Sequence, residues 1–189
     1  MEKAALKLVV IGGSAGSVDV IMRIVPFLPS DPDFSIVLVL HRKSSDDTTL
    51  EDVVSIKSAM KVIPVEDKTM LETGAIFIAP SDYHLLFEPT GELSLDVSEK
   101  INYSRPSIDV SFESAAAIYK NRLTAILLTG ANSDGTAGLI SVKENDGFVI
   151  IQDPESADIP FMPANALENM TPDLVLDVDG IVNFLNSGF

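Results

Sequence analysis

The stretch Leu8-Val9-Val10-Ile11-Gly12-Gly13-Ser14-Ala15-Gly16-Ser17 decides the fold that we expect for this chain. The apolar, β-branched run over residues 8–11 predicts a buried strand. A turn of small residues follows it, and a helix-compatible pattern comes next. Gly12, Ser14 and Gly16 match the spacing G-x-S-x-G, which places a serine on a tight turn between strand and helix. The Ser14 hydroxyl would then lie at the end of a sheet, beside helical N–H groups that favour negative charge.

The same turn is compatible with two simpler roles. Ser14 or Ser17 could cap the following helix, or the turn could cradle a phosphate. The dinucleotide fingerprint G-x-G-x-x-G is not met, because Ser14 and Ser17 occupy the positions of its second and third glycines. A nucleophile, a helix cap and an anion-binding turn therefore stay open for this stretch.

The composition limits the classes of protein to which this chain can belong. A chain of 189 residues with 46% hydrophobic residues predicts one compact α/β domain. The net charge of −15 argues against nucleic acid and anionic membranes as partners. With no cysteine and 2 histidines, we expect no thiolate zinc site and no histidine-rich metal site. We see neither a signal peptide nor a run long enough to span a bilayer, so we expect a cytoplasmic protein without membrane insertion.

The remaining periodicity predicts a three-layer α/β fold. A helix over 18–28 joins the first strand to a second one at 34–40, which makes a right-handed βαβ unit with parallel strands. We expect further buried strands at 123–129, 148–151 and 174–176, helices at 48–60, 108–119 and 179–186, and a polar loop at 43–49. The short strand 62–65 should lie at an edge because it contains Pro64.

A different pattern occupies the middle of the chain. Short strands at 75–79, 85–87 and 93–97 are separated by turn sequences, which predicts an antiparallel hairpin or meander beside the parallel sheet. The whole is then a mostly parallel, doubly wound sheet with helices on both faces and an inserted antiparallel hairpin.

Two further polar residues follow buried strands. His41 comes directly after the second strand, and Asp134 lies in the small-residue turn after the strand at 123–129. Because the carboxyl ends of parallel strands meet at one edge, we expect Ser14, His41 and Asp134 to lie together there. Taken singly, His41 could be a buried histidine bonded to backbone, and Asp134 a helix N-cap.

Together these three residue types form the set that ester hydrolysis requires. A histidine takes the serine proton, a carboxylate orients the imidazole, and N–H groups at helix starts hold the oxyanion. We expect one ring nitrogen of His41 to bond Ser14 Oγ and the other to face Asp134. The chain order Ser, His, Asp differs from the order Ser, Asp, His of the α/β-hydrolases.

An ordered series of motifs resembles a known family. From residue 9 to about 185, the chain is similar to the catalytic domain of the chemotaxis protein-glutamate methylesterases of the CheB type. The matching motifs are residues 11–16, His41, residues 78–84, residues 105–110, residues 128–130, Asp134-Gly135, and Met162-Pro163 before a helix of small residues.

The resemblance implies a role for each matched position. Ser14 would be the nucleophile, His41 the general base and Asp134 its orienting acid, with the N–H of Ala131 in the oxyanion hole. Ala15 and Arg105 are candidate substrate-binding residues, although Arg105 could simply be a solvated residue at a loop end. The implied reaction hydrolyses glutamate methyl esters on the cytoplasmic helices of methylated chemoreceptors to glutamate and methanol, and some members also deamidate receptor glutamines. No cofactor and no metal are expected.

The chain also departs from the family pattern. Ala131 and Asn132 stand where Met and Gly are common, and Ser17 stands where a second glycine is usual. The sequence starts with the catalytic sheet, so we expect a single catalytic domain over 1–189, no receiver domain, and no regulation by phosphorylation in cis. A separate regulator is a further candidate partner. The alternative function is a non-catalytic module that keeps the fold and binds a receptor helix or a small anion.

Overall fold

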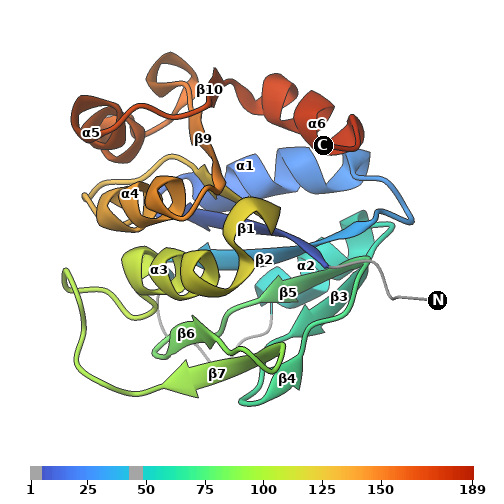
Figure 1. Ribbon diagram of the computed structural model, residues 1–189. Helices are drawn as coiled ribbons and strands as arrows, with labels where there is room; N and C mark the ends of the chain where they lie inside the picture. Colours follow the sequence, from blue (N-terminus) through green and yellow to red (C-terminus); the bar gives the residue numbers. More distant parts are fainter. Residues whose placement is uncertain (1–5, 43–48) are drawn as a thin grey trace.

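The computed structural model describes residues 6–42 and 49–189, which are built around a seven-stranded sheet (Figure 1). The strand order is β10-β9-β8-β1-β2-β5-β3, and every neighbouring pair is parallel. The strands are β1 (Lys7–Gly13), β2 (Phe34–Leu40), β3 (Lys61–Pro64), β5 (Ala75–Ile78), β8 (Leu123–Leu127), β9 (Phe148–Gln152) and β10 (Leu174–Leu176). The predicted parallel sheet is therefore confirmed.

The two faces of the sheet are covered by different helices, as the alternating side chains of β1 show. Val9 and Ile11 pack with residues of α1 (Ser17–Ile24), α2 (Thr49–Lys57) and α6 (Val178–Asn186). Leu8 and Val10 belong to the core that contains α3 (Ile108–Tyr119), α4 (Thr136–Glu144) and α5 (Phe161–Asn169). Both faces of the strand are buried, which explains its continuous apolar run. The three-layer arrangement is confirmed.

Strand order reverses at β1, and this reversal positions the site. The chain builds β2, β3 and β5 on one side of β1, then crosses back to build β8, β9 and β10 on the other side. In open α/β sheets, ligands bind beyond the carboxyl ends of the strands at such a reversal. Ser14 follows the last residue of β1 directly, so it lies at this point.

A small antiparallel sheet stands beside the main one. It has the order β4-β7-β6, with β4 (Thr69–Met70), β6 (His84–Phe87) and β7 (Glu92–Asp96). It attaches to α3, since Ser111 Oγ donates to the carbonyl of Leu85 at 2.9 Å. The predicted hairpin is thus present, with one correction. The segment that we assigned to it at 75–79 is β5, which lies between β2 and β3 in the parallel sheet. All four β5 residues are buried, as in a strand covered on both faces.

Several boundaries also differ from the predicted ones. The helix predicted at 18–28 ends at Ile24, and a 3₁₀ turn over Val25–Phe27 follows it. Pro26 accounts for this end, because it has no N–H to donate to the preceding turn. Pro163 lies within the first turn of α5 rather than before it. Two more 3₁₀ turns span Lys120–Arg122 and Pro154–Ser156.

The other predicted elements fall close to their expected places. The strand β3 is an edge strand, as Pro64 indicates. Ser107 caps α3 by accepting from the N–H of Val110 at 3.4 Å. The helix predicted at 48–60 is α2, and the predicted polar loop lies outside the described residues apart from Thr49. Within the described ranges, no helix has the length and apolar character needed to cross a bilayer.

Candidate active site

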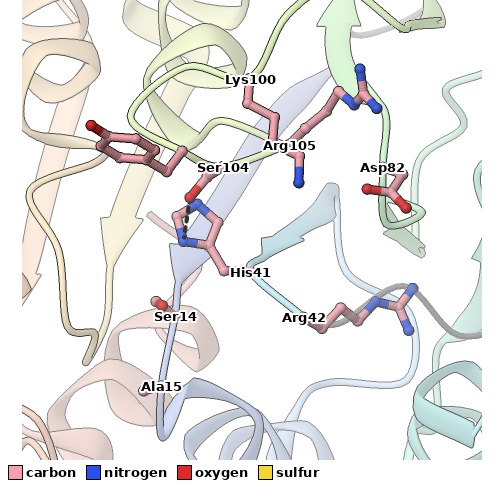
Figure 2. Close-up of a pocket in the computed structure, with 9 residues that line it drawn as sticks. Ser14, Ala15, His41, Arg42, Asp82, Lys100, Ser104 and Arg105 are labelled. Carbon is pink, nitrogen blue, oxygen red and sulfur yellow. Dashed lines mark hydrogen bonds between the residues drawn. The ribbon is translucent and has the colours of Figure 1, made fainter.

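Ser14 and His41 lie side by side at the carboxyl ends of β1 and β2. The register pairs Gly13 with Leu40, and the N–H of His41 donates to the Gly13 carbonyl at 2.9 Å. The N–H of Ser14 donates to the Thr129 carbonyl at 3.0 Å, which ties the serine to the segment after β8. A cavity of about 570 Å³ opens here (Figure 2). Its described lining is Ser14, Ala15, His41, Arg42, Asp82, Lys100, Tyr103, Ser104 and Arg105.

The turn after β1 presents the Ser14 hydroxyl to this cavity. Gly16 is the N-cap of α1 and has a φ of 83°, a conformation that side chains disfavour. No side chain caps this helix. Ser17 is buried, and its Oγ donates to the Ser14 carbonyl at 2.5 Å. Neither serine is a side-chain cap, so helix capping is not the role of this turn.

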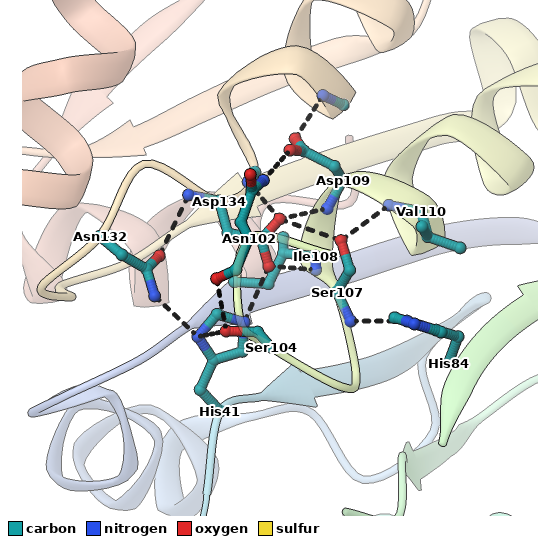
Figure 3. A network of polar contacts seen from close by, with 12 residues as sticks. His41, His84, Asn102, Ser104, Ser107, Ile108, Asp109, Val110, Asn132 and Asp134 are labelled. Carbon is teal, nitrogen blue, oxygen red and sulfur yellow. Dashed lines mark hydrogen bonds and ion pairs between the residues drawn. The ribbon is translucent and has the colours of Figure 1, made fainter. Parts of the chain in front are cut away.

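His41 and Asp134 form the central pair of the site, with 2.8 Å between Nε2 and Oδ2 (Figure 3). The Asp134 side chain is fully buried. Its carboxylate also accepts from Ser107 Oγ and from the N–H groups of residues 108, 109 and 135, at 2.7–3.1 Å. Burial alone would raise the pKa of Asp134, but the hydrogen bonds from His41, Ile108 and Asp109 outweigh it and lower the pKa. The group is therefore an ionised carboxylate at neutral pH.

Asp134 is not the N-cap of its own helix. Gly135 holds that position in α4, with a φ of 95°. The carboxylate instead receives the free N–H groups at the start of α3, where the helix dipole favours negative charge. The alternative that Asp134 merely caps the following helix is thus wrong, and so is the alternative that His41 is satisfied by backbone alone.

The partner of Nε2 fixes the tautomer of His41. An ionised carboxylate accepts hydrogen bonds only, so Nε2 carries the proton and Nδ1 has the free lone pair. Asn132 Nδ2 lies 3.3 Å from Nδ1, and Ser104 Oγ lies 3.4 Å from it. The Asn132 amide is oriented by its Oδ1, which accepts from the N–H of Asp134 at 3.0 Å. The basic nitrogen of His41 is therefore Nδ1.

One expected contact is not made. Among the described residues, Ser14 Oγ forms no hydrogen bond to His41, so that part of the predicted geometry is wrong for this structure. The side chains that contact Nδ1 are instead those of Asn132 and Ser104. Sequence reasoning noted Asn132 as an unusual residue but missed Ser104. Ser104 lies in an irregular loop where no periodicity or motif marks it.

The turn after β8 approaches Ser14 closely. A Cβ on Gly130 would lie 2.9 Å from Ser14 Cβ and 2.6 Å from Met162 Cε, so this position requires glycine. Ala131 comes next and is exposed, and within the described residues its N–H donates to no acceptor. Ala131 does not line the cavity, whereas Ala15 does. The N–H of Ala131 is therefore free to donate to a bound ligand.

Arg105 lines the cavity, yet its guanidinium is largely committed to the protein. Nη1 donates to the carbonyls of Val97 and Ser98, both at 2.8 Å. Its Nε is buried and has no partner in the described structure. The other histidine, His84, is buried as well, and its Nδ1 accepts from the N–H of Ser107 at 3.1 Å. No three histidine or carboxylate side chains in the described ranges are grouped as metal ligands would be.

Comparisons with known proteins agree on one family. The family model described as CheB methylesterase matches residues 9–185. A protein of Leptospira interrogans named "Putative protein-glutamate methylesterase/protein-glutamine glutaminase" is 39% identical over 173 residues, which cover 92% of this chain and 90% of the relative. A Thermotoga maritima protein with the same name, without "putative", is 37% identical over 90% of this chain and 50% of its own length.

A solved structure extends this likeness to three dimensions. The crystal structure of the Thermotoga maritima CheB methylesterase catalytic domain superposes with a TM-score of 0.91 at 35% identity. The match covers 96% of this chain and 98% of that domain.

Proposed function

This chain belongs to the CheB methylesterase family, and we propose that it hydrolyses γ-methyl esters of protein glutamate side chains through Ser14, His41 and Asp134. The names of its relatives support the reaction, including hydrolysis of glutamine side chains. The observation that carries the assignment is the 2.8 Å contact between His41 Nε2 and a buried Asp134, because it leaves Nδ1 as a base beside Ser14.

The first step is attack on the ester carbonyl carbon by Ser14 Oγ. A serine hydroxyl is a weak nucleophile until a base takes its proton, and His41 Nδ1 is that base. For this step, Ser14 Oγ turns toward Nδ1 and displaces Asn132 or Ser104 from the surroundings of that nitrogen. Asp134 stays ionised and stabilises the imidazolium that forms.

The oxyanion and the leaving group complete acylation. Ala15 follows Ser14 directly, and Ala131 follows Gly130, which closely approaches Ser14. The N–H groups of Ala15 and Ala131 make no hydrogen bonds within the described structure, so both can donate to the oxyanion. The imidazolium returns its proton to the methoxy oxygen, and methanol leaves. Water then attacks the acyl-enzyme with His41 again as base. The bond between the acyl carbon and Ser14 Oγ breaks, the imidazolium returns the proton to Oγ, and the glutamate side chain is released. With a glutamine side chain, ammonia leaves instead of methanol.

The proposed substrates are methylated chemoreceptors, at their cytoplasmic signalling helices. This part of the proposal rests on the family to which the chain belongs. We therefore propose that the protein acts in the cytoplasm.

The test is methanol release from methylated receptor membranes. We expect Ser14→Ala and His41→Ala each to reduce turnover by several orders of magnitude, with the double variant little worse, because the members of a triad act as a unit. Additive losses in the double variant would argue against a shared mechanism. Thermal melts of each variant check that the fold is retained.

Ser104→Ala is the matched control, because Ser104 Oγ contacts Nδ1 in this structure and Ser14 Oγ does not. If Ser14 is the nucleophile, Ser104→Ala retains most of the turnover, and a serine-directed sulfonyl fluoride labels Ser14. Labelling of Ser104, with loss of turnover in Ser104→Ala alone, would reassign the nucleophile.

A further inference from the structure

The described lining of the cavity has the opposite charge balance to the whole chain. Its described lining includes the cations Arg42, Lys100 and Arg105 and one carboxylate, Asp82. The chain as a whole has 28 acidic residues and 13 basic ones. A cationic lining in an acidic protein raises the local concentration of anionic groups and repels cationic ones.

Two of the three cations already have partners. Arg42 pairs with the Glu51 carboxylate and also donates to the Ala79 carbonyl at 3.2 Å. Arg105 is bound to the carbonyls of Val97 and Ser98. Lys100 differs, because in the described part of the chain its ammonium makes neither an ion pair nor a hydrogen bond. Figure 2 shows its side chain extending into the cavity, above His41.

The backbone on both sides of Lys100 is anchored. His84 Nδ1 accepts from Ser107, so Nε2 carries the proton and donates to the Glu99 carbonyl at 2.9 Å. On the other side, Ile101 and Ser104 exchange backbone hydrogen bonds at 3.2 and 2.9 Å. An unpaired cation is thus held at the cavity by a fixed loop rather than by a free chain segment.

We infer that Lys100 is a specificity-determining residue that binds a second carboxylate of the substrate, next to the reacting ester. This inference rests on the proposed function and adds the substrate class: a methyl ester set in an acidic segment. The second carboxylate should bind at Lys100 and away from Asp82, because the negative charge of Asp82 repels anions.

The experiment uses synthetic peptides with one γ-methyl glutamate and one further glutamate, placed one, three or four residues from the ester on either side. The matched peptides carry glutamine in place of that further glutamate. Dissociation constants are measured with the Ser14→Ala protein, and KM and kcat with the unmodified chain. At one or more placements, we expect the glutamate peptide to bind about two- to fivefold more tightly, the range for an exposed ion pair. The gain should appear in KM with kcat little changed, as for uniform binding, and should shrink at high salt.

Two substitutions test whether Lys100 causes the preference for the glutamate peptide. Lys100→Ala should abolish the difference between the glutamate and glutamine peptides, and Lys100→Glu should reverse it. Lys57→Glu, at an exposed lysine in the last turn of α2, makes the same charge change and should keep the preference. Asp82→Asn should strengthen binding of the glutamate peptide.

Three results would overturn the inference: no glutamate preference at any placement, a preference that survives Lys100→Ala, or equal weakening of both peptides in Lys100→Ala. The last would show that Lys100 only maintains the loop. Failure of the proposed function is a separate result, because it would appear as methanol release that does not depend on Ser14.

Discussion

At the ring of His41, the resting protein holds its basic nitrogen in contact with a side-chain amide. Asn132 bridges the pair, with Nδ2 at Nδ1 of His41 and Oδ1 on the N–H of Asp134. Its φ is not in the left-handed region, so the glycine that is common in the family is not required here by backbone conformation. Asn132 therefore adds contacts to the pair and also contacts the nitrogen that Ser14 must reach.

Asn132→Gly should raise kcat/KM for methyl ester hydrolysis about two- to tenfold, since the contact that must break is worth about one hydrogen bond. The same change should lower the free energy of unfolding by about 1–2 kcal/mol, through the lost bond to Asp134 and the added freedom of glycine. Methanol release and urea titration measure the two effects. Asn132→Ala is the control that removes the contacts while adding less freedom. A tenfold loss of activity in both variants would instead make Asn132 a positioning residue of the base.

The sequence predicted which side chains lie together at the site, but not which of their atoms contact one another. Ser14, His41 and Asp134 each follow a buried strand, so their shared edge follows from topology. The choice between Nδ1 and Nε2, and the positions of Ser104 and Asn132, depend on side-chain rotamers in irregular loops. No periodicity encodes those.

Between elements, a second buried carboxylate joins the starts of two helices. Asp109, in the first turn of α3, accepts from the N–H of Gly138 in α4 at 2.7 Å. The helices are close here, because a Cβ on Gly138 would lie 3.0 Å from Asp109 Cα. Asn102 Nδ2 also reaches Asp109, at 3.3 Å. Burial raises the pKa of Asp109 to about 6, the Gly138 bond opposes this shift, and the neighbouring charge of Asp134 adds to it.

A raised carboxyl pKa makes stability fall as pH rises. Between its unfolded pKa and about 6, folded Asp109 binds more protons than the unfolded chain does, so its contribution decreases across that window and is lost above pH 6. Asp109→Asn removes this titration and keeps an acceptor for Gly138. We expect the stability of the variant relative to the wild type to rise by about 1 kcal/mol from pH 5 to pH 8.

Urea titrations at the two pH values measure this difference. Glu113 is the other carboxyl that acts on Asp109, so Glu113→Gln is the control and should show a much smaller change. A stability difference between Asp109→Asn and wild type that does not vary with pH would contradict the prediction.

The positions of the strands were easier to predict than the pairing between them. The segments of β1, β2 and β8 were evident because strands covered on both faces need continuous apolar runs. The same feature misled us at β5, whose short apolar run does not indicate whether its neighbours are parallel or antiparallel. The pairing of β5 with β2 and β3 is decided by tertiary packing.

For the whole molecule, a parallel, doubly wound sheet was predictable from alternating strands and helices, and the strand order in the structure brings the site residues to one edge. The cationic cavity was not predictable from composition, because a net charge of −15 says nothing of how the charges are distributed. That distribution arises where a loop after the small sheet folds back over the ends of β1 and β2.

The His41–Asp134 contact joins residues 93 positions apart, and it has a kinetic consequence. His41 follows β2 and Asp134 follows β8, while β1 separates those strands, so the pair cannot exist before all three are paired. Such long-range contacts form late, because loop closure precedes their gain. On refolding from urea, methanol release should therefore never recover ahead of the far-ultraviolet circular dichroism signal. Early recovery of turnover, with that signal still largely unformed, would show that a partly assembled sheet suffices. If turnover instead requires the fully paired sheet, enzymatic turnover is a direct assay for completed folding of this chain.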